Sequence, residues 1–137
     1  MSKELFESFT RIDDFFLYLL VSLVYLGVFV VIYVRVTPYH EIQLIREGNM
    51  AASFSLSGSI LGFIVPLAAA IQHSVSIADM ALWGVVAMVV QVLTYVAVKM
   101  AIPTITDDIP ANKGSVGFFL GTVSLGVGLL NAACMSW

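Results

Sequence analysis

The 137-residue chain is poor in charge: Asp, Glu, Lys and Arg make up 11% of it, against about 25% in an average soluble domain. Its six basic residues form no cluster and its net charge is −3, which excludes the basic surface of a nucleic-acid-binding protein. The single cysteine, Cys134, cannot form a disulfide within the chain, so we expect it to be a small packing residue. Hydrophobic residues dominate instead, at 60%, with a mean hydropathy of +0.99.

The few charges are confined to segments 1–14, 35–47 and 99–113 and to Asp79. They separate four uncharged stretches, each close to or above the roughly 20 apolar residues that cross a bilayer. No stretch is left for a soluble domain. The sequence therefore predicts an all-α polytopic membrane protein with four transmembrane helices, at about 15–36, 50–72, 80–101 and 114–135.

The first stretch does not read as a cleaved signal peptide, because the segment before it carries four acidic and two basic residues. Between the first two spans, Thr37 and Pro38 have the residue types of an N-cap and a first helical position. They predict a short helix at the membrane surface that ends at Gly48. Asn49 is the expected cap of the second span, and Ser76 with Asp79 forms a capping pair for the third.

Small residues recur at helical spacing in the second and fourth spans. In lipid, small residues mark places where two helix backbones approach closely. We expect helix packing at Gly58 and Gly62 with Ser55 and Pro66 on the same face, and at Gly117, Gly121 and Gly128.

Polar side chains inside the spans are few, and apart from the thiol of Cys134 none is ionisable. Proton relays and ion-coupled carriers normally place charged groups there, so a pump is disfavoured. The deepest polar groups are Gln91, Ser59 and Ser124, with Asn131 further out. Because the first three share a depth, we expect Gln91 to reach Ser59 or Ser124. The alternative is that these groups form a polar constriction in an oligomeric pore.

The two halves of the chain resemble each other. A shift of 64 residues makes six of the 23 pairs from 49/113 to 71/135 identical, and a shift of 65 pairs Pro38 with Pro103. This indicates two repeats of two helices, 1–73 and 74–137. Since each repeat crosses the membrane twice, the repeats would have the same orientation, related by an axis along the membrane normal.

The positive-inside rule orients the chain, because four basic residues follow the first and third spans and only Lys3 and Arg11 lie on the other side. The four are Arg35, Arg46, Lys99 and Lys113. The loops at 37–49 and 102–113 are therefore expected in the cytoplasm, and both termini outside. Within those loops Glu41, Arg46 and Asn49 are candidate contacts for a cytoplasmic protein. His40-Glu41 and Asp107-Asp108 lack the further ligands of a metal site, and no nucleophile–base arrangement is present. We expect neither an enzyme nor a bound cofactor or metal.

Three segments resemble the YjfL family of bacterial inner-membrane proteins, a domain of unknown function (number 350). They read TPYHEIQLIREGNMAASFSLSGSILGFIVPLAAAI, SVSIADMALWGVVAMVVQ and SLGVGLLNAACMSW. The resemblance implies an inner-membrane protein with four spans, a domain present twice, and a link to envelope or stress physiology. Family members tend to open the last span with Asn-x-Ala-Ala, where this chain has Lys113-Gly114-Ser115-Val116. We expect Asn112 to cap that span instead.

Two functions fit these observations. The first is a structural or accessory membrane subunit that forms a homo-oligomer and offers its cytoplasmic loops to a protein partner. The alternative is an oligomeric channel for ions or small solutes, lined by the Ser- and Gly-rich helices and Gln91.

Overall fold

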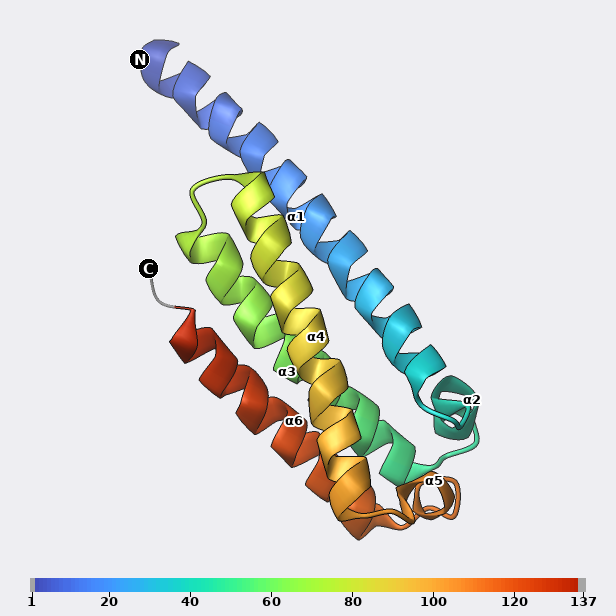
Figure 1. Ribbon diagram of the computed structural model, residues 1–137. Coiled ribbons are helices and arrows are strands. Elements are labelled where there is room, and N and C mark those ends of the chain that lie inside the picture. The colour runs from blue at the N-terminus through green and yellow to red at the C-terminus, as the bar shows by residue number, and fades with distance from the viewer. Residues whose placement is uncertain (1, 136–137) are drawn as a thin grey trace.

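The computed structural model describes residues 2–135, and all of its regular elements are helices. Four of them are long and apolar enough to cross a membrane. They are α1 (Ser2–Val36), α3 (Met50–His73), α4 (Ile77–Ala101) and α6 (Gly114–Cys134). Two short helices, α2 (Glu41–Arg46) and α5 (Ile105–Asp108), lie together at one end of the bundle (Figure 1). The start of α1, the α3–α4 turn and the end of α6 lie toward the other end.

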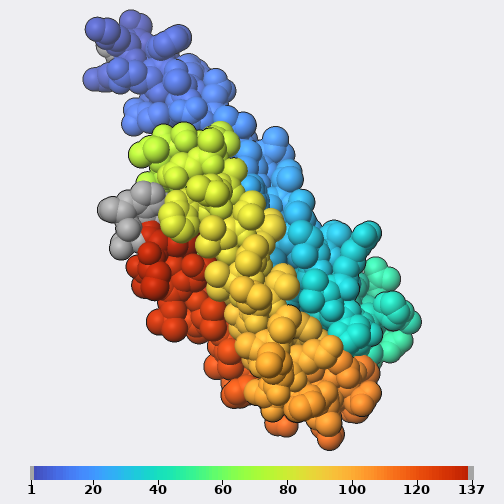
Figure 2. Space-filling model, in the orientation of Figure 1, coloured from blue at the N-terminus to red at the C-terminus, as the bar shows by residue number. Residues whose placement is uncertain are grey.

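The prediction of four apolar helices is confirmed, but the predicted start of the first one is wrong. We expected α1 to begin near residue 15, whereas it begins at Ser2 and has 35 residues. At 1.5 Å per residue it is about 52 Å long, well beyond a hydrocarbon core of about 30 Å. Charges at residues 3–14 end the apolar stretch but do not end a helix. This charged first part of α1 projects beyond the other helices (Figure 2).

The ends of the other long helices fall close to the predicted ones. Asn49 caps α3, with its side chain accepting a hydrogen bond from the Ala52 backbone N–H at 2.8 Å. Ser76 accepts one from the Asp79 N–H at 3.1 Å, so α4 begins at Ile77, three residues before the predicted start. Capping residues thus mark these two starts more accurately than hydropathy does.

The predicted start of the short surface helix is wrong. Thr37 does not cap α2, because its backbone N–H still bonds to the Tyr33 carbonyl of α1 at 3.1 Å and its hydroxyl donates to Val34. The residue therefore ends α1, and α2 begins four residues later at Glu41. Gly48 follows α2 with a φ of +88°, a left-handed conformation that suits glycine.

The closest helix–helix contact in the bundle is between α3 and α6, which run parallel. All five glycines expected to pack lie in this seam, where a Cβ would overlap the backbone of the opposite helix. The pairs are Gly58 with Gly121, Gly62 with Ser124, Gly117 with Ala51, Gly121 with Phe54 and Gly128 with Gly62. Because glycine has no side chain, the two backbones can touch. Cα–H groups then face carbonyl oxygens across the seam.

Pro66 lies inside α3 and is buried in the same seam. Proline has no N–H, so the carbonyl of Gly62, four residues earlier, loses its usual helical donor. That oxygen faces the Cα of Gly128, where a Cβ would overlap it. The close approach of α6 therefore covers the backbone group that Pro66 leaves without a helical hydrogen bond.

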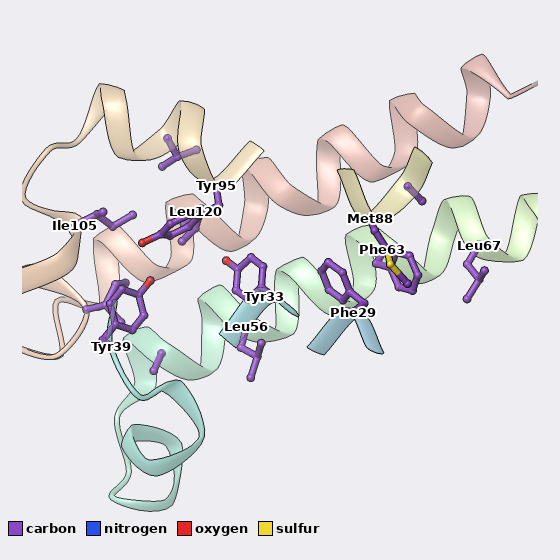
Figure 3. Close-up of a cluster of buried hydrophobic side chains, with 14 of the residues drawn as sticks. Phe29, Tyr33, Tyr39, Leu56, Phe63, Leu67, Met88, Tyr95, Ile105 and Leu120 are labelled. Atoms are coloured by element: carbon purple, nitrogen blue, oxygen red, sulfur yellow. The ribbon is translucent and has the colours of Figure 1, made fainter. Parts of the chain in front are cut away.

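Helix α1 contacts the bundle through aromatic side chains, with Val21, Leu26 and Val30 packed beside them. Phe29 stacks on Phe63 with ring centroids 4.5 Å apart (Figure 3). The hydroxyl of Tyr25 donates to the Ala81 carbonyl at 2.7 Å, and its ring covers Gly84. Most of the other large side chains of α1 are exposed. The helix therefore offers a wide apolar face to lipid or to another chain.

The seam makes a prediction about glycine substitutions. Gly121→Ala places a methyl group against the Phe54 carbonyl, and we expect it to lower the free energy of unfolding by about 1–3 kcal/mol. Gly126→Ala is the matched control on the same helix, because a Cβ at Gly126 has nothing within 4 Å. It should change stability by less than about 0.5 kcal/mol. Unfolding in detergent micelles measures both, and equal losses would contradict the seam.

Candidate functional site

The polar groups at the middle of the spans meet inside one chain. Gln91, Ser59 and Ser124 are at most 1% exposed. Gln91 Nε2 donates to the backbone carbonyl of Ser124 at 3.0 Å. Ser59 Oγ donates to the Ser55 carbonyl and lies 3.4 Å from Ser124 Oγ. Gln91 thus reaches Ser124, as expected, but through the backbone oxygen and not through the hydroxyl.

Asn131 does not join this group. It lies seven residues further along α6 than Ser124, about 10 Å at 1.5 Å per residue. Its side chain is half-buried, and its Nδ2 has no hydrogen-bond partner among residues 2–135. Of the four intramembrane polar residues singled out from the sequence, three therefore form one buried group and Asn131 stands apart.

Two asparagines join the loops at the α2/α5 end of the bundle. Asn49 caps α3 through its Oδ1, while its Nδ2 donates to the carbonyls of Ile109 and Pro110 at 2.9 and 3.3 Å. Asn112 reaches in the opposite direction, and its Oδ1 accepts a hydrogen bond from the Ala51 N–H at 3.1 Å. We call Asn49 and Asn112 the asparagine clasp. It ties the start of α3 to the segment that enters α6.

The clasp corrects two expectations. Asn49 was a candidate for contacting a partner protein, but it is only 8% exposed and its side chain is used within the chain. Asn112 was expected to cap α6, but it caps the start of α3, and Lys113 precedes α6 without a side-chain cap. The reason is the left-handed backbone of Asn112, with a φ of 61°, a conformation that asparagine tolerates better than most residues. A single sequence does not reveal that a residue caps a helix about 60 positions away in the chain.

The carboxylate of Asp108, the last residue of α5, stabilises this short helix and the loop after it. Asp108 accepts a hydrogen bond from the Thr104 hydroxyl at 2.7 Å and pairs with Lys113 at 3.2 Å. The hydroxyl and then the ammonium lower the pKa of Asp108. Its neighbour Asp107 is exposed. Within residues 2–135, no group of three His, Cys, Asp or Glu side chains is placed to hold a metal ion.

Glu41 is the largest departure from expectation. It was a candidate for contacting a cytoplasmic protein, yet its side chain is fully buried, with 0% exposed. Helix α2 packs on α3, and Glu41 lies at the first position of α2, on the side that faces the bundle. Arg46, at the last position of α2, is exposed as expected.

Three buried tyrosines surround Glu41, from α1, from the segment before α2 and from α4. They are Tyr33, Tyr39 and Tyr95, and the close-up shows them gathered near Ile105 and Leu120 (Figure 3). The rings of Tyr33 and Tyr95 meet edge to face with centroids 5.8 Å apart. Burial and then the charge of Glu41 raise the pKa of Tyr39. We call these four residues the Glu41 cluster.

Reasoning from the sequence missed this cluster. Tyr33 and Tyr95 lie near the ends of predicted spans, where tyrosine is ordinary, and Glu41 lies in a loop that reads as solvated. Only the fold brings the end of α1, the start of α2 and the end of α4 together. Burial raises the pKa of Glu41 to about 7, and the nearby Thr37 hydroxyl opposes this shift.

Four apolar helices with a closed polar centre define a multi-pass membrane protein. The model of one family, Domain of Unknown Function (DUF350), matches residues 4–135, so the chain belongs to that family. The match runs through both halves and does not by itself divide the chain into two copies.

Named relatives agree with this assignment. The chain is 38% identical over 120 residues to the UPF0719 inner membrane protein YjfL of Escherichia coli, covering 88% of this chain and 91% of the relative. It is 30% identical over 122 residues to the UPF0719 transmembrane protein YshE of Bacillus subtilis, covering 85% and 88%. No solved structure matches the chain.

The asparagine clasp predicts different losses for two substitutions. Asn49→Ala removes both the cap of α3 and the donation to Ile109 and Pro110, and should cost about 2 kcal/mol of unfolding free energy. Asn49→Asp keeps an oxygen for the cap but loses the donor.

Chemical unfolding of both variants in micelles measures the two parts. Ser53→Ala, on the first turn of the same helix with a half-buried side chain, is the control and should stay near wild type. An Asn49→Ala variant as stable as this control would show that the clasp contributes nothing.

Proposed function

We propose that the chain is a structural or accessory subunit of the bacterial inner membrane, in keeping with the printed names of its relatives. It serves by docking a cytoplasmic protein on the outer face of α2, and it has a role in envelope or stress physiology. The observation that supports this proposal is an exposed polar surface on a helix that packs against the bundle. His40, Gln43, Arg46 and Glu47 are all exposed, while α2 behind them packs on α3.

The outer α2 face, defined as these four residues, has the properties of a docking surface. Shallow hollows border it on two sides, one shared with Val34 and the other with Pro110. The four side chains include a basic, an acidic and an amide group, which suits recognition by hydrogen bonds and charge. The asparagine clasp and Asp108 hold the neighbouring loop, so the surface has a defined shape.

We further propose that the chain consists of two like-oriented hairpins, 1–73 and 74–137. Every close contact of the α3–α6 seam joins residues 62 to 67 apart, near the 64-residue shift of the sequence repeat. Parallel packing of corresponding helices suits two repeats related by an axis along the membrane normal. Both termini would then be periplasmic, and α2 and α5 cytoplasmic.

We also propose a homo-oligomer, formed through α1. Large side chains along α1, among them Leu20 and Val24, are more than half exposed, and α1 makes few contacts with its own bundle. The alternative of an oligomeric channel has less support, because Gln91, Ser59 and Ser124 are buried against one another inside one chain and do not line a surface between chains.

Reporter fusions test the orientation. An alkaline phosphatase domain, active only outside the cytoplasm, should be active when fused after residue 137 or within the α3–α4 turn at Val75, and inactive within the α2–α3 turn at Gly48. Activity at Gly48 would overturn the proposed orientation, and activity at only one of the two external sites would overturn the four-span arrangement.

Photo-crosslinking tests the docking surface. A photoreactive residue at Gln43 or Arg46 should capture a cytoplasmic protein in growing cells, because both side chains are exposed on α2. The control is the same residue at Val75, which is 91% exposed at the opposite end of the bundle. Arg46→Glu should reduce capture at Gln43 several-fold. Capture that is absent at both positions, or equal at Val75, would contradict the proposal.

A further inference from the structure

The side chain of Glu41 is buried without a partner for either oxygen. Neither Oε1 nor Oε2 has a hydrogen bond within the part of the chain that the structure describes. Thr37 is near, but its hydroxyl donates to the Val34 carbonyl. No cation is among the groups that shift the pKa of Glu41. An ionised carboxylate in such a place is strongly disfavoured, and burial normally ends with the group neutral.

The surroundings of Glu41 offer hydroxyl groups from three directions. Tyr33 comes from α1, Tyr39 from the segment before α2, and Tyr95 from α4; each interacts electrostatically with Glu41. The hydroxyl of Tyr33 lies near Ser59, and those of Tyr39 and Tyr95 lie near each other, but none of the three makes a hydrogen bond of normal geometry among the described residues. A phenol can donate to a carboxylate and accept from a carboxylic acid, so these groups suit either form of Glu41 during proton exchange.

The occupant that fits this cluster is a proton and not a metal ion. A buried metal ion needs space and several strong oxygen ligands, whereas the cluster supplies one carboxylate and neutral phenols. The hollows beside α2 are lined by His40, Gln43 and Glu47 and not by Glu41. A proton needs no cavity.

We propose that Glu41 is a proton-binding site of the bundle, and that the proton it holds keeps α2 docked on the tyrosines. When the proton leaves, the ionised carboxylate is more stable in water than in the protein interior. Helix α2 then separates from the end of the bundle more often. The outer α2 face lies on this helix, so the site couples cytoplasmic pH to the surface that we propose for docking. The proton site itself does not depend on that docking function.

The direction of the pH effect follows from the two states of α2. In the docked state the pKa of Glu41 is raised from 4.5 to about 7, whereas an undocked α2 would expose the carboxyl to water. Between these values the docked state binds more protons, so undocking increases as pH rises. The increase is up to about tenfold per pH unit in this window and levels off above it. The other titratable groups that face Glu41 are the phenols of Tyr33, Tyr39 and Tyr95.

The first experiment detects the proton itself. Full-length protein in lipid nanodiscs is titrated by infrared difference spectroscopy, which follows the carbonyl stretch of a protonated carboxylic acid. All variants carry His40→Gln, so that no exposed imidazole remains beside α2. We expect an acid band that disappears with a midpoint near neutral pH and is absent in Glu41→Gln. Glu47→Gln, which changes an exposed carboxyl at the end of the same helix, should keep the band.

The second experiment detects the movement of α2. Hydrogen exchange at the amides of Leu44 and Glu47, which bond to His40 and Gln43 within α2, reports its opening after correction for intrinsic exchange rates. Protection should fall with rising pH below neutrality, by up to about tenfold per unit, and should be flat in Glu41→Gln. The Gln variant resembles the neutral acid in shape, so it should fold.

Three results would overturn the proposal. One is a Glu41 acid band that titrates as low as an exposed carboxyl. Another is a titration midpoint that moves with Na⁺ or K⁺ at constant ionic strength, which would make the site a metal site. The third is α2 protection with the same pH dependence in Glu41→Gln as in the parent protein, which would sever the link between the proton and α2. Failure of crosslinking at Gln43 bears only on the docking function, so the two proposals fail separately.

Discussion

The contact between the backbones of α3 and α6 is the constraint on which the rest of the structure depends. Lipid provides no hydrophobic drive between helices, so two spans associate closely only where their surfaces fit and their polar groups meet. Glycines at 58, 62, 117, 121 and 128 provide that fit. The seam fixes the depth of both helices, brings Ser59 within 3.4 Å of Ser124, and places the Ser124 carbonyl where Gln91 of α4 can reach it.

The seam also determines what happens at the α2/α5 end of the bundle. Because α3 and α6 begin side by side, Asn49 and Asn112 can each satisfy backbone groups of the other hairpin. The segment before α3 forms α2, which packs on α3, and its first residue, Glu41, is buried where it interacts electrostatically with Tyr33 and Tyr95. The buried carboxylate therefore lies at the end of the bundle where the two central helices begin.

Much of the fold was readable from the sequence because membrane insertion acts on single segments. Each span is recognisable as a run of about 20 uncharged residues. Asn49 and Ser76 cap their helices by accepting hydrogen bonds from backbone N–H groups three positions later. Helix spacing also identified the packing glycines, since small residues on one face are a local pattern. The predicted start of α1 was wrong because the helix continues into the charged residues before the apolar stretch. The predicted role of Thr37 was wrong because its backbone N–H bonds to Tyr33 of the preceding helix.

The sequence by itself therefore determined the number of spans, their apolar faces and the residues of the seam. Only the tertiary structure decided which polar residues are available for function. Glu41 and Asn49 were candidate contacts for a cytoplasmic protein, and both are buried, whereas Gln43, Arg46 and Glu47 of the same segment are exposed. The physical reason is that burial of a loop side chain depends on residues far away in the chain. Tyr95 lies 54 positions from Glu41 and Ile109 lies 60 from Asn49, and no local periodicity encodes such a distance.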